Sequence, residues 1–257
     1  MAHLKKISSV ITHNIENGAA KAMLYGLGLS QKNLDNYLVG IGSMSFDGNP
    51  CNKHLKKLQD NVKKSVNKSQ QTGLSFNTIG VSDGITNGNS GMHYSLPSRE
   101  LIADSIETMI NAHHYDGFVL IPGCDKNLPA SMMAMGRINR PSLLVYGGSM
   151  YPGNYKNNNV DIVNAFQSYG ELLNNEITNN ERESLLKSCC HKSGGSCSGM
   201  YTCNTMAIIA EVMGLSLPYS SSNPAASKEK IHECNNVGNE LLHILDLDIK
   251  PRDIVTK

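Results

Sequence analysis

Short apolar runs alternate with longer amphipathic segments along this chain, and no other feature of the sequence restricts its fold as strongly. Apolar side chains recur at steps of three and four within residues 54–72, which predicts a helix that ends near Gly73. Residues 74–81 are rich in β-forming side chains and short enough to be a strand. A second helix is predicted to begin after an N-cap at Ser98 and to end at Gly117.

The alternation continues toward the carboxyl end. Residues 118–121 form a continuous apolar run, typical of a strand covered on both faces, and residues 143–146 repeat it after an apolar helix from about Ala130. Further predicted elements are helices at residues 160–173, 200–212 and 228–245 and a polar, exposed loop at residues 151–159. We therefore expect one α/β domain over residues 1–257, a layered, mainly parallel sheet flanked by helices, with ligands at the loops beyond the strand carboxyl ends.

The charge balance argues against a polyanionic partner. The chain has 23 Lys and Arg against 22 Asp and Glu, a formal net charge of +1, so composition alone does not attract nucleic acid. No run reaches the ~18 to 20 apolar residues that span a bilayer, and the first ten residues lack the apolar core of a secretion signal. We expect a cytoplasmic protein, or one of an organelle matrix or stroma if a presequence has been removed, with no membrane partner.

The chain has seven cysteines, and none of them belongs to a CxxC pair or a zinc-finger spacing. Two interpretations stay open for such thiols: inert, buried small residues, or ligands of a soft metal gathered from distant loops. Cys203 is assigned to the first class, and Cys189, Cys190 and Cys234 are assigned to structure or chance, with a redox-sensitive thiol as the alternative for Cys190.

Three of the cysteines lie in loops marked by Gly or Pro: Cys51 in FDGNPCNKH, Cys124 in IPGCDKN and Cys197 in SGGSCSGM. Any one of them taken alone fits a buried small residue. Taken together, glycines permit a close backbone approach, and three thiolates can hold an iron–sulfur cluster while one iron keeps an open position. An open iron is a Lewis acid that can draw a hydroxyl group off carbon.

A second group of residues is acidic. Asp83 follows a predicted strand, and Asp125 lies beside Cys124 in the exit loop of the next strand, so both would meet at one sheet edge as hard oxygen ligands for Mg²⁺. The alternative is that both aspartates only cap turns. Lys126 is either a surface ammonium or, next to a metal, a neutral or modified side chain.

Three long segments carry a resemblance to a known family: FNTIGVSDGITNGNSGMHYSLPSRELIADSIE, GCDKNLPASMMAMGRINRP and CSGMYTCNTMAIIAEVMGLSLPYSSSNPA. They resemble the dihydroxy-acid dehydratases, within a wider family that includes the phosphogluconate dehydratases. The resemblance implies that Cys51, Cys124 and Cys197 hold an iron–sulfur cluster. It also implies that Asp83, Asp125 and a carbamylated Lys126 bind Mg²⁺. It is closest to enzymes with a [2Fe–2S] cluster, and the sequence alone leaves [4Fe–4S] open.

The resemblance implies a hydro-lyase of valine and isoleucine biosynthesis that converts 2,3-dihydroxy-3-methyl acids into 2-oxo acids, as a homodimer. Alternatives are a sugar-acid dehydratase of the phosphogluconate type and an inactive iron–sulfur-binding fragment. Family members have a second half that this chain lacks, which supplies another carboxylate for Mg²⁺ and the serine proposed as the base. We therefore identify no catalytic residue here and expect the 257-residue chain to be the N-terminal part of the enzyme. In the third cysteine loop, Cys189–Lys192 departs from the family's Cys-Pro pattern.

Overall fold

A parallel four-stranded sheet forms the centre of the computed structural model, which describes residues 7–256. The strands are β1 (Tyr37–Ser43), β2 (Gln71–Asn77), β3 (Gly117–Ile121) and β4 (Ser142–Leu144). Their order across the sheet is β2-β1-β3-β4, and every neighbouring pair is parallel. The expected α/β fold with a mainly parallel sheet is confirmed.

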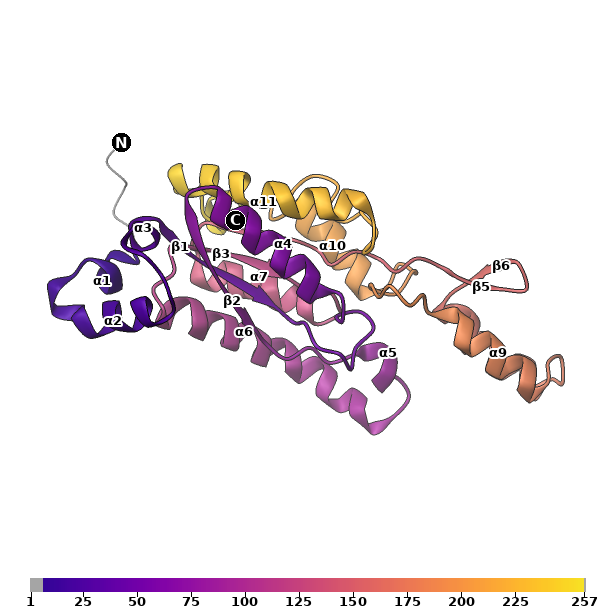
Figure 1. The fold of residues 1–257 in the computed structure, drawn as a ribbon. Helices are drawn as coiled ribbons and strands as arrows, with labels where there is room; N and C mark the ends of the chain where they lie inside the picture. Colours follow the sequence, from indigo (N-terminus) through magenta and orange to yellow (C-terminus); the bar gives the residue numbers. More distant parts are fainter. Residues whose placement is uncertain (1–6, 257) are drawn as a thin grey trace.

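Helices cover both faces of this sheet (Figure 1). The main helices are α4 (Leu55–Lys68), α6 (Ser95–Ala112), α7 (Asn127–Ile138), α10 (Thr202–Val212) and α11 (Lys228–Asp246). Side chains of α4 and α11 share one buried cluster with Val39 and Ile41 of β1, whereas α6, α7 and α10 share another with Leu38. The alternation of side chains along β1 therefore fills a separate core on each face of the sheet.

Shorter elements lie around this frame. They are α1 (Ser9–Thr12), η1 (Ile15–Asn17), α2 (Gly18–Gly26), α3 (Gln31–Asp35), α5 (Asp83–Thr86), η2 (Ser90–Tyr94) and α12 (Pro251–Ile254). A projecting arm consists of the antiparallel strands β5 (Gly153–Tyr155) and β6 (Asn158–Val160) with α8 (Ile162–Leu173) and α9 (Asn179–Cys189) (Figure 1). None of the helices within residues 7–256 combines the length and apolar character that crossing a membrane requires.

The central strand β1 was not predicted from the sequence pattern. Its run YLVGIGS is wholly buried, but Gly40 and Gly42 dilute the apolar signal. A Cβ at Gly40 would lie 2.5 Å from Ile110 Cδ1, and a Cβ at Gly42 would lie 2.8 Å from the side chains of Leu120 and Phe76. Glycine is needed at both positions because neighbouring side chains pack directly onto the backbone of the strand.

Three predicted boundaries are wrong for local reasons. Helix α6 ends at Ala112, because His114 is left-handed (φ 49°), and Gly117 begins β3 rather than ending the helix. Helix α4 ends before Gln70, whose φ of 57° is left-handed, so Gly73 belongs to β2 rather than stopping the helix. Helix α6 begins at Ser95, three residues before the expected N-cap Ser98, and Pro97 fits its first turn. The loop predicted at residues 151–159 contains the β5–β6 hairpin, and α9 was not predicted.

The strand order creates a crevice at the carboxyl edge of the sheet. Strand β2 pairs with one edge of β1, and β3 pairs with the other edge. The connections that follow β1 and β3 therefore run to opposite sides, which leaves a gap between these two strands. Loops beyond the strands of an α/β sheet form ligand sites at such a switch point. The segments that carry Cys51 and Cys124 follow β1 and β3. The predicted position of these motifs, beyond the strand carboxyl ends, is confirmed.

Close packing of α4 against α11 gives a first testable prediction. A Cβ at Gly238 of α11 would lie 2.3 Å from the backbone oxygen of Ser65, so Gly238→Ala forces the two helices apart. We expect a loss of about 1 to 3 kcal/mol in the free energy of unfolding by urea. The matched control is Gly170→Ala in α8, where nothing lies within 4 Å of the new Cβ and a helical Ala should gain about 0.5 to 1 kcal/mol. Equal effects of the two substitutions would contradict this packing.

Candidate functional site

The six residues singled out in the sequence line a single cavity of about 520 Å³. They are Cys51, Asp83, Cys124, Asp125, Lys126 and Cys197. Three exit loops of the sheet supply five of them, beyond β1, β2 and β3, and the segment before α10 supplies the sixth. A cavity of this volume is large enough for a small organic molecule.

Backbone contacts bring the Cys197 segment to the sheet edge. Gly195 N–H donates to the Pro50 carbonyl (N···O 3.1 Å), and Ser196 N–H donates to the Gly148 carbonyl (3.0 Å). The left-handed φ of Gly194 (81°) and a φ of 127° at Gly195 allow this approach. The third cysteine loop is thereby fixed against the loop that carries Cys51.

Cys51 lies between the other two thiols in its interactions. Hydrogen bonding with Cys124 and with Cys197, together with burial, raises the pKa of the Cys51 thiol. The same hydrogen bonds lower the pKa of Cys124 and of Cys197. Cys51 and Cys124 are buried and Cys197 is half-buried. The arrangement favours thiolates at Cys124 and Cys197, the form in which cysteine binds metals.

Two further donors act on the Cys124 sulfur. The Asn49 side chain and the backbone N–H of Asp83 both donate hydrogen bonds to it and add to the lowering of its pKa. Asn49 is fully buried and its Oδ1 accepts from the Cys51 backbone N–H at 2.9 Å. Donors of this kind stabilise negative charge on a sulfur in a partly dry site.

The acidic side of the cavity is built around Asp83. Lys126 Nζ donates to its Oδ2 at 2.7 Å, and Ser95 Oγ donates to its Oδ1 at 2.6 Å. Asp125 lies close enough to Asp83 for their carboxyl groups to share a hydrogen bond, and burial followed by the charge of Asp83 raises the pKa of Asp125. The backbone N–H of Cys203 donates to Asp125 Oδ1 at 3.2 Å.

The negative charge of these two carboxylates exceeds the positive charge of the cationic side chains around them. Two carboxylates meet at the cavity wall, and Lys126 is the one cation among the described residues that line it. Such a pair attracts a hard cation. Within residues 7–256, however, no three His, Cys, Asp or Glu side chains are placed so that they alone could surround one metal ion.

Several residues that shape the site were not predicted from the sequence. The Asn49 side chain donates to the Cys124 sulfur, and the Ser95 hydroxyl donates to Asp83. An apolar part of the cavity wall comes from α8, through Ile162 and Phe166. Asn49 lies within the FDGNPCNKH motif, which was the only signal that could have found it. The other three belong to types that occur throughout any protein, so their pattern carries no chemical signal.

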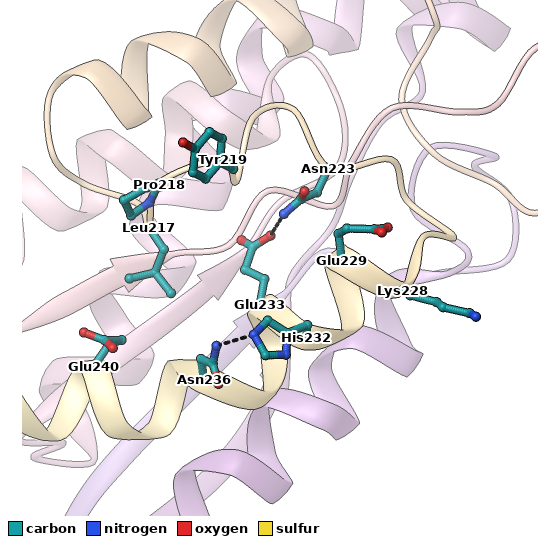
Figure 2. Close-up of a pocket in the computed structure, with 10 residues that line it drawn as sticks. All are labelled: Leu217, Pro218, Tyr219, Asn223, Lys228, Glu229, His232, Glu233, Asn236 and Glu240. Atoms are coloured by element: carbon teal, nitrogen blue, oxygen red, sulfur yellow. Dashed lines mark hydrogen bonds between the residues drawn. The ribbon is translucent and has the colours of Figure 1, made fainter.

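A roomier cavity of about 810 Å³ lies elsewhere, beside α11 and the segment that follows α10 (Figure 2). Glu233, Asn223 and His232 line it, and Asn223 Nδ2 donates to Glu233 Oε2 at 3.1 Å. None of its lining residues is a cysteine or an aspartate. Its volume exceeds that of the thiol-lined cavity, but its side chains do not offer the same chemistry.

The ion pair between Lys126 and Asp83 supplies a second prediction. Both side chains are largely buried, 17% and 9% exposed, so Lys126→Met leaves two adjacent carboxylates without their cation. We expect the metal-free chain to lose about 3 kcal/mol of unfolding free energy in urea. The control is Lys56→Met, which breaks a pair with Asp60 whose partners are 59% and 48% exposed and should cost less than about 0.5 kcal/mol. The double variant Lys126→Met with Asp83→Asn should recover part of the lost unfolding free energy. Equal losses for Lys126→Met and Lys56→Met would refute a buried ion pair at Lys126.

Comparison with known proteins identifies the family. Residues 37–257 match the family described as "Dihydroxy-acid/6-phosphogluconate dehydratase N-terminal". The chain is 52% identical over 254 residues to the dihydroxy-acid dehydratase of Francisella tularensis subsp. novicida, covering 99% of this chain and 45% of that protein. It is 51% identical to the mitochondrial dihydroxy-acid dehydratase of Saccharomyces cerevisiae (99% and 44% covered). It is also 51% identical to the chloroplastic enzyme of Arabidopsis thaliana (98% and 41% covered).

The chain therefore spans just under half the length of these relatives, 41% to 45%. Identity near one half over almost all of its residues, together with the family match, leaves no doubt about kinship. The chain belongs to the dihydroxy-acid/6-phosphogluconate dehydratase family, and its residues 37–257 correspond to the N-terminal region of that family.

Proposed function

We propose that residues 1–257 form the cluster- and magnesium-binding part of a dihydroxy-acid dehydratase, a hydro-lyase of branched-chain amino-acid biosynthesis. One observation carries the proposal: three thiols and two carboxylates from four separate segments line one cavity. Relatives that share about half of its residues are named dihydroxy-acid dehydratases. The whole enzyme would convert 2,3-dihydroxy-3-methyl acids into 2-oxo acids.

The thiol side fits an iron–sulfur cluster. Cys51 interacts with Cys124 and with Cys197, and two N–H donors point at the Cys124 sulfur. Three thiolates at one cavity can hold an iron–sulfur cluster with one iron left open. This donor set suits either cluster type, and we propose [2Fe–2S] because the sequence resembles the enzymes that carry it.

The carboxylate side fits Mg²⁺. Asp83 and Asp125 offer hard oxygen atoms, and Lys126 lies against Asp83 at 2.7 Å. A carbamate on Lys126 would replace the ammonium by a third anionic group, and three anionic groups at one cavity wall require a divalent cation. In this role Ser95 would hold the orientation of Asp83 through its hydrogen bond.

When bound, the cluster would supply an iron Lewis acid for the departing C3 hydroxyl, and Mg²⁺ would neutralise the substrate carboxylate and the C2 oxygen. The cavity lining combines the carboxylates of Asp83 and Asp125 with apolar side chains. Met200, Met206 and Phe166 are among the apolar ones, and they would contact the methyl-bearing carbon and exclude water. The proton on C2 would be taken by a base from the second half of the enzyme.

The cavity lining favours a branched aliphatic acid over a sugar acid. Sugar acids present a hydroxyl on each carbon, and a phosphorylated one also needs a cluster of basic side chains. The described lining holds no Arg, and Lys126 is its only basic side chain. A sugar-acid dehydratase is therefore the second candidate, supported by the breadth of the family alone.

Two further attributes are part of this proposal. The full-length enzyme would be a homodimer, and it would act in the cytoplasm or in an organelle matrix, since relatives include bacterial, mitochondrial and chloroplastic proteins. A non-catalytic iron–sulfur-binding fragment is the remaining alternative, and it differs in binding iron without forming a 2-oxo acid.

Cysteine substitutions test the cluster. After anaerobic reconstitution with iron and sulfide, we expect the chain to hold iron and absorb visible light. Cys51→Ser, Cys124→Ser and Cys197→Ser should each lower the bound iron about tenfold or more, because each removes a direct ligand. Cys234→Ser is the matched control, since that thiol is buried in α11 and does not line the cavity. Unchanged iron and colour in any of the first three variants would refute the cluster assignment.

Turnover tests the reaction. We expect the reconstituted chain with Mg²⁺, mixed with the C-terminal half of the Francisella relative, to form a 2-oxo acid from 2,3-dihydroxy-3-methylbutanoate, measured as its hydrazone. Without that half, the rate should fall by about 10²- to 10⁴-fold, the usual contribution of a general base. Gluconate serves as the comparison substrate. Turnover of gluconate alone would favour the sugar-acid alternative, and bound iron without any turnover would favour the inactive fragment.

A further inference from the structure

We infer that Asn204 is a positioning residue for Cys197, and that the buried Tyr146 fixes Asn204 in the orientation this requires. Asn204 lies in the first turn of α10, and Tyr146 follows β4. Neither side chain lines the thiol-lined cavity. The inference rests on the proposed cluster site and adds residues that would act through one of its ligands.

Both N–H donors of the Asn204 carboxamide are used, and its oxygen accepts one hydrogen bond. Its Nδ2 donates to the Cys197 carbonyl at 2.8 Å and to the Gly199 carbonyl at 2.6 Å. Its Oδ1 accepts from the Tyr146 hydroxyl at 2.5 Å. Two carbonyls on either side of Ser198 are thereby fixed to one rigid amide plane, which sets the direction in which the loop carries the Cys197 side chain.

Tyr146 is itself held from several directions. Its side chain is fully buried, and its backbone N–H donates to Ser220 Oγ at 3.3 Å. Lys230 Nζ lies 5.6 Å from the centre of its ring, and that ammonium is paired with Glu233 at 2.7 Å. A phenol with this support has one low-energy position, so its hydroxyl can select the amide orientation of Asn204.

Different hydrogen bonds hold the residues before and after Cys197. On the amino side, Ser196 Oγ donates to the Gly123 carbonyl at 2.7 Å, and backbone bonds link Ser196 with Gly148 and Met150. On the carboxyl side, Asn204 makes the contacts to the Cys197 and Gly199 carbonyls. Without the Asn204 donors, the Cys197 carbonyl would lose its side-chain partner, while Ser198 Oγ would still donate to the Met150 carbonyl at 3.2 Å and Tyr201 N–H to the Gly199 carbonyl at 2.8 Å.

The test measures how fast iron leaves the reconstituted chain when a chelator is added. Asn204→Asp keeps the size of the side chain but replaces both donors by a carboxylate that faces two carbonyls, so we expect release about tenfold faster or more. Tyr146→Phe removes only the hydroxyl and should speed release by a smaller factor. The matched control is Tyr155→Phe, because the Tyr155 hydroxyl donates to the Glu181 carbonyl within the projecting arm, and release should be unchanged.

Two further measurements distinguish a role in positioning Cys197 from a general effect on the stability of the protein. The thermal midpoint of each metal-free variant is measured, and the electron paramagnetic resonance spectrum of each reduced cluster is compared with that of the parent chain. Faster release with a changed spectrum and a near-parental midpoint supports the inference. Parental release rates and spectra in both Asn204→Asp and Tyr146→Phe would overturn it and leave the cluster proposal standing. Failure of the parent chain to take up iron would overturn both.

Discussion

The parallel pairing of β1 with β3 is the constraint on which the rest of the structure depends. Ser43 at the end of β1 lies opposite Ile121 at the end of β3, so the two exit loops leave the sheet side by side. Cys51 and Cys124 come from these two loops. The register therefore decides whether the two thiols meet, and the glycines of β1 are part of it because they admit the packing that keeps the strand central.

Asp83 connects the soft and the hard sides of the cavity. Its backbone N–H donates to the Cys124 sulfur, while its carboxylate binds Lys126 and Ser95. A shift of this residue would change both the charge environment of a thiolate and the geometry of the carboxylate pair. In the proposed enzyme, such a shared residue would set the separation between the magnesium side and the cluster side of the cavity.

Sequence reasoning reached the fold class and the residues of the cavity wall for a physical reason. The strand–helix alternation places the loops after the strands at one edge, and the resemblance to the dehydratases singled out the thiols and carboxylates of those loops. The position of Cys197 could not be predicted in this way, because no strand precedes it and its backbone bonds to Pro50 and Gly148 are tertiary contacts. The sequence did not predict the roles of Asn49, Ser95 and Asn204 for a related reason. An amide or hydroxyl acquires a role only through the groups that the fold places next to it.

The charge balance at Asp83, Asp125 and Lys126 implies a linkage between cation binding and lysine modification in the proposed enzyme. With Lys126 as an ammonium, the three groups sum to one negative charge, and the Lys126–Asp83 pair satisfies a carboxylate that is 9% exposed. A carbamate would raise the sum to three negative charges in a partly buried wall, which is unfavourable without a dication. Mg²⁺ would therefore favour the carbamate, and the carbamate would favour Mg²⁺ by the same free energy, because coupling between two binding equilibria is reciprocal. In the proposed enzyme, the ammonium form would then hold the carboxylates together until the metal binds.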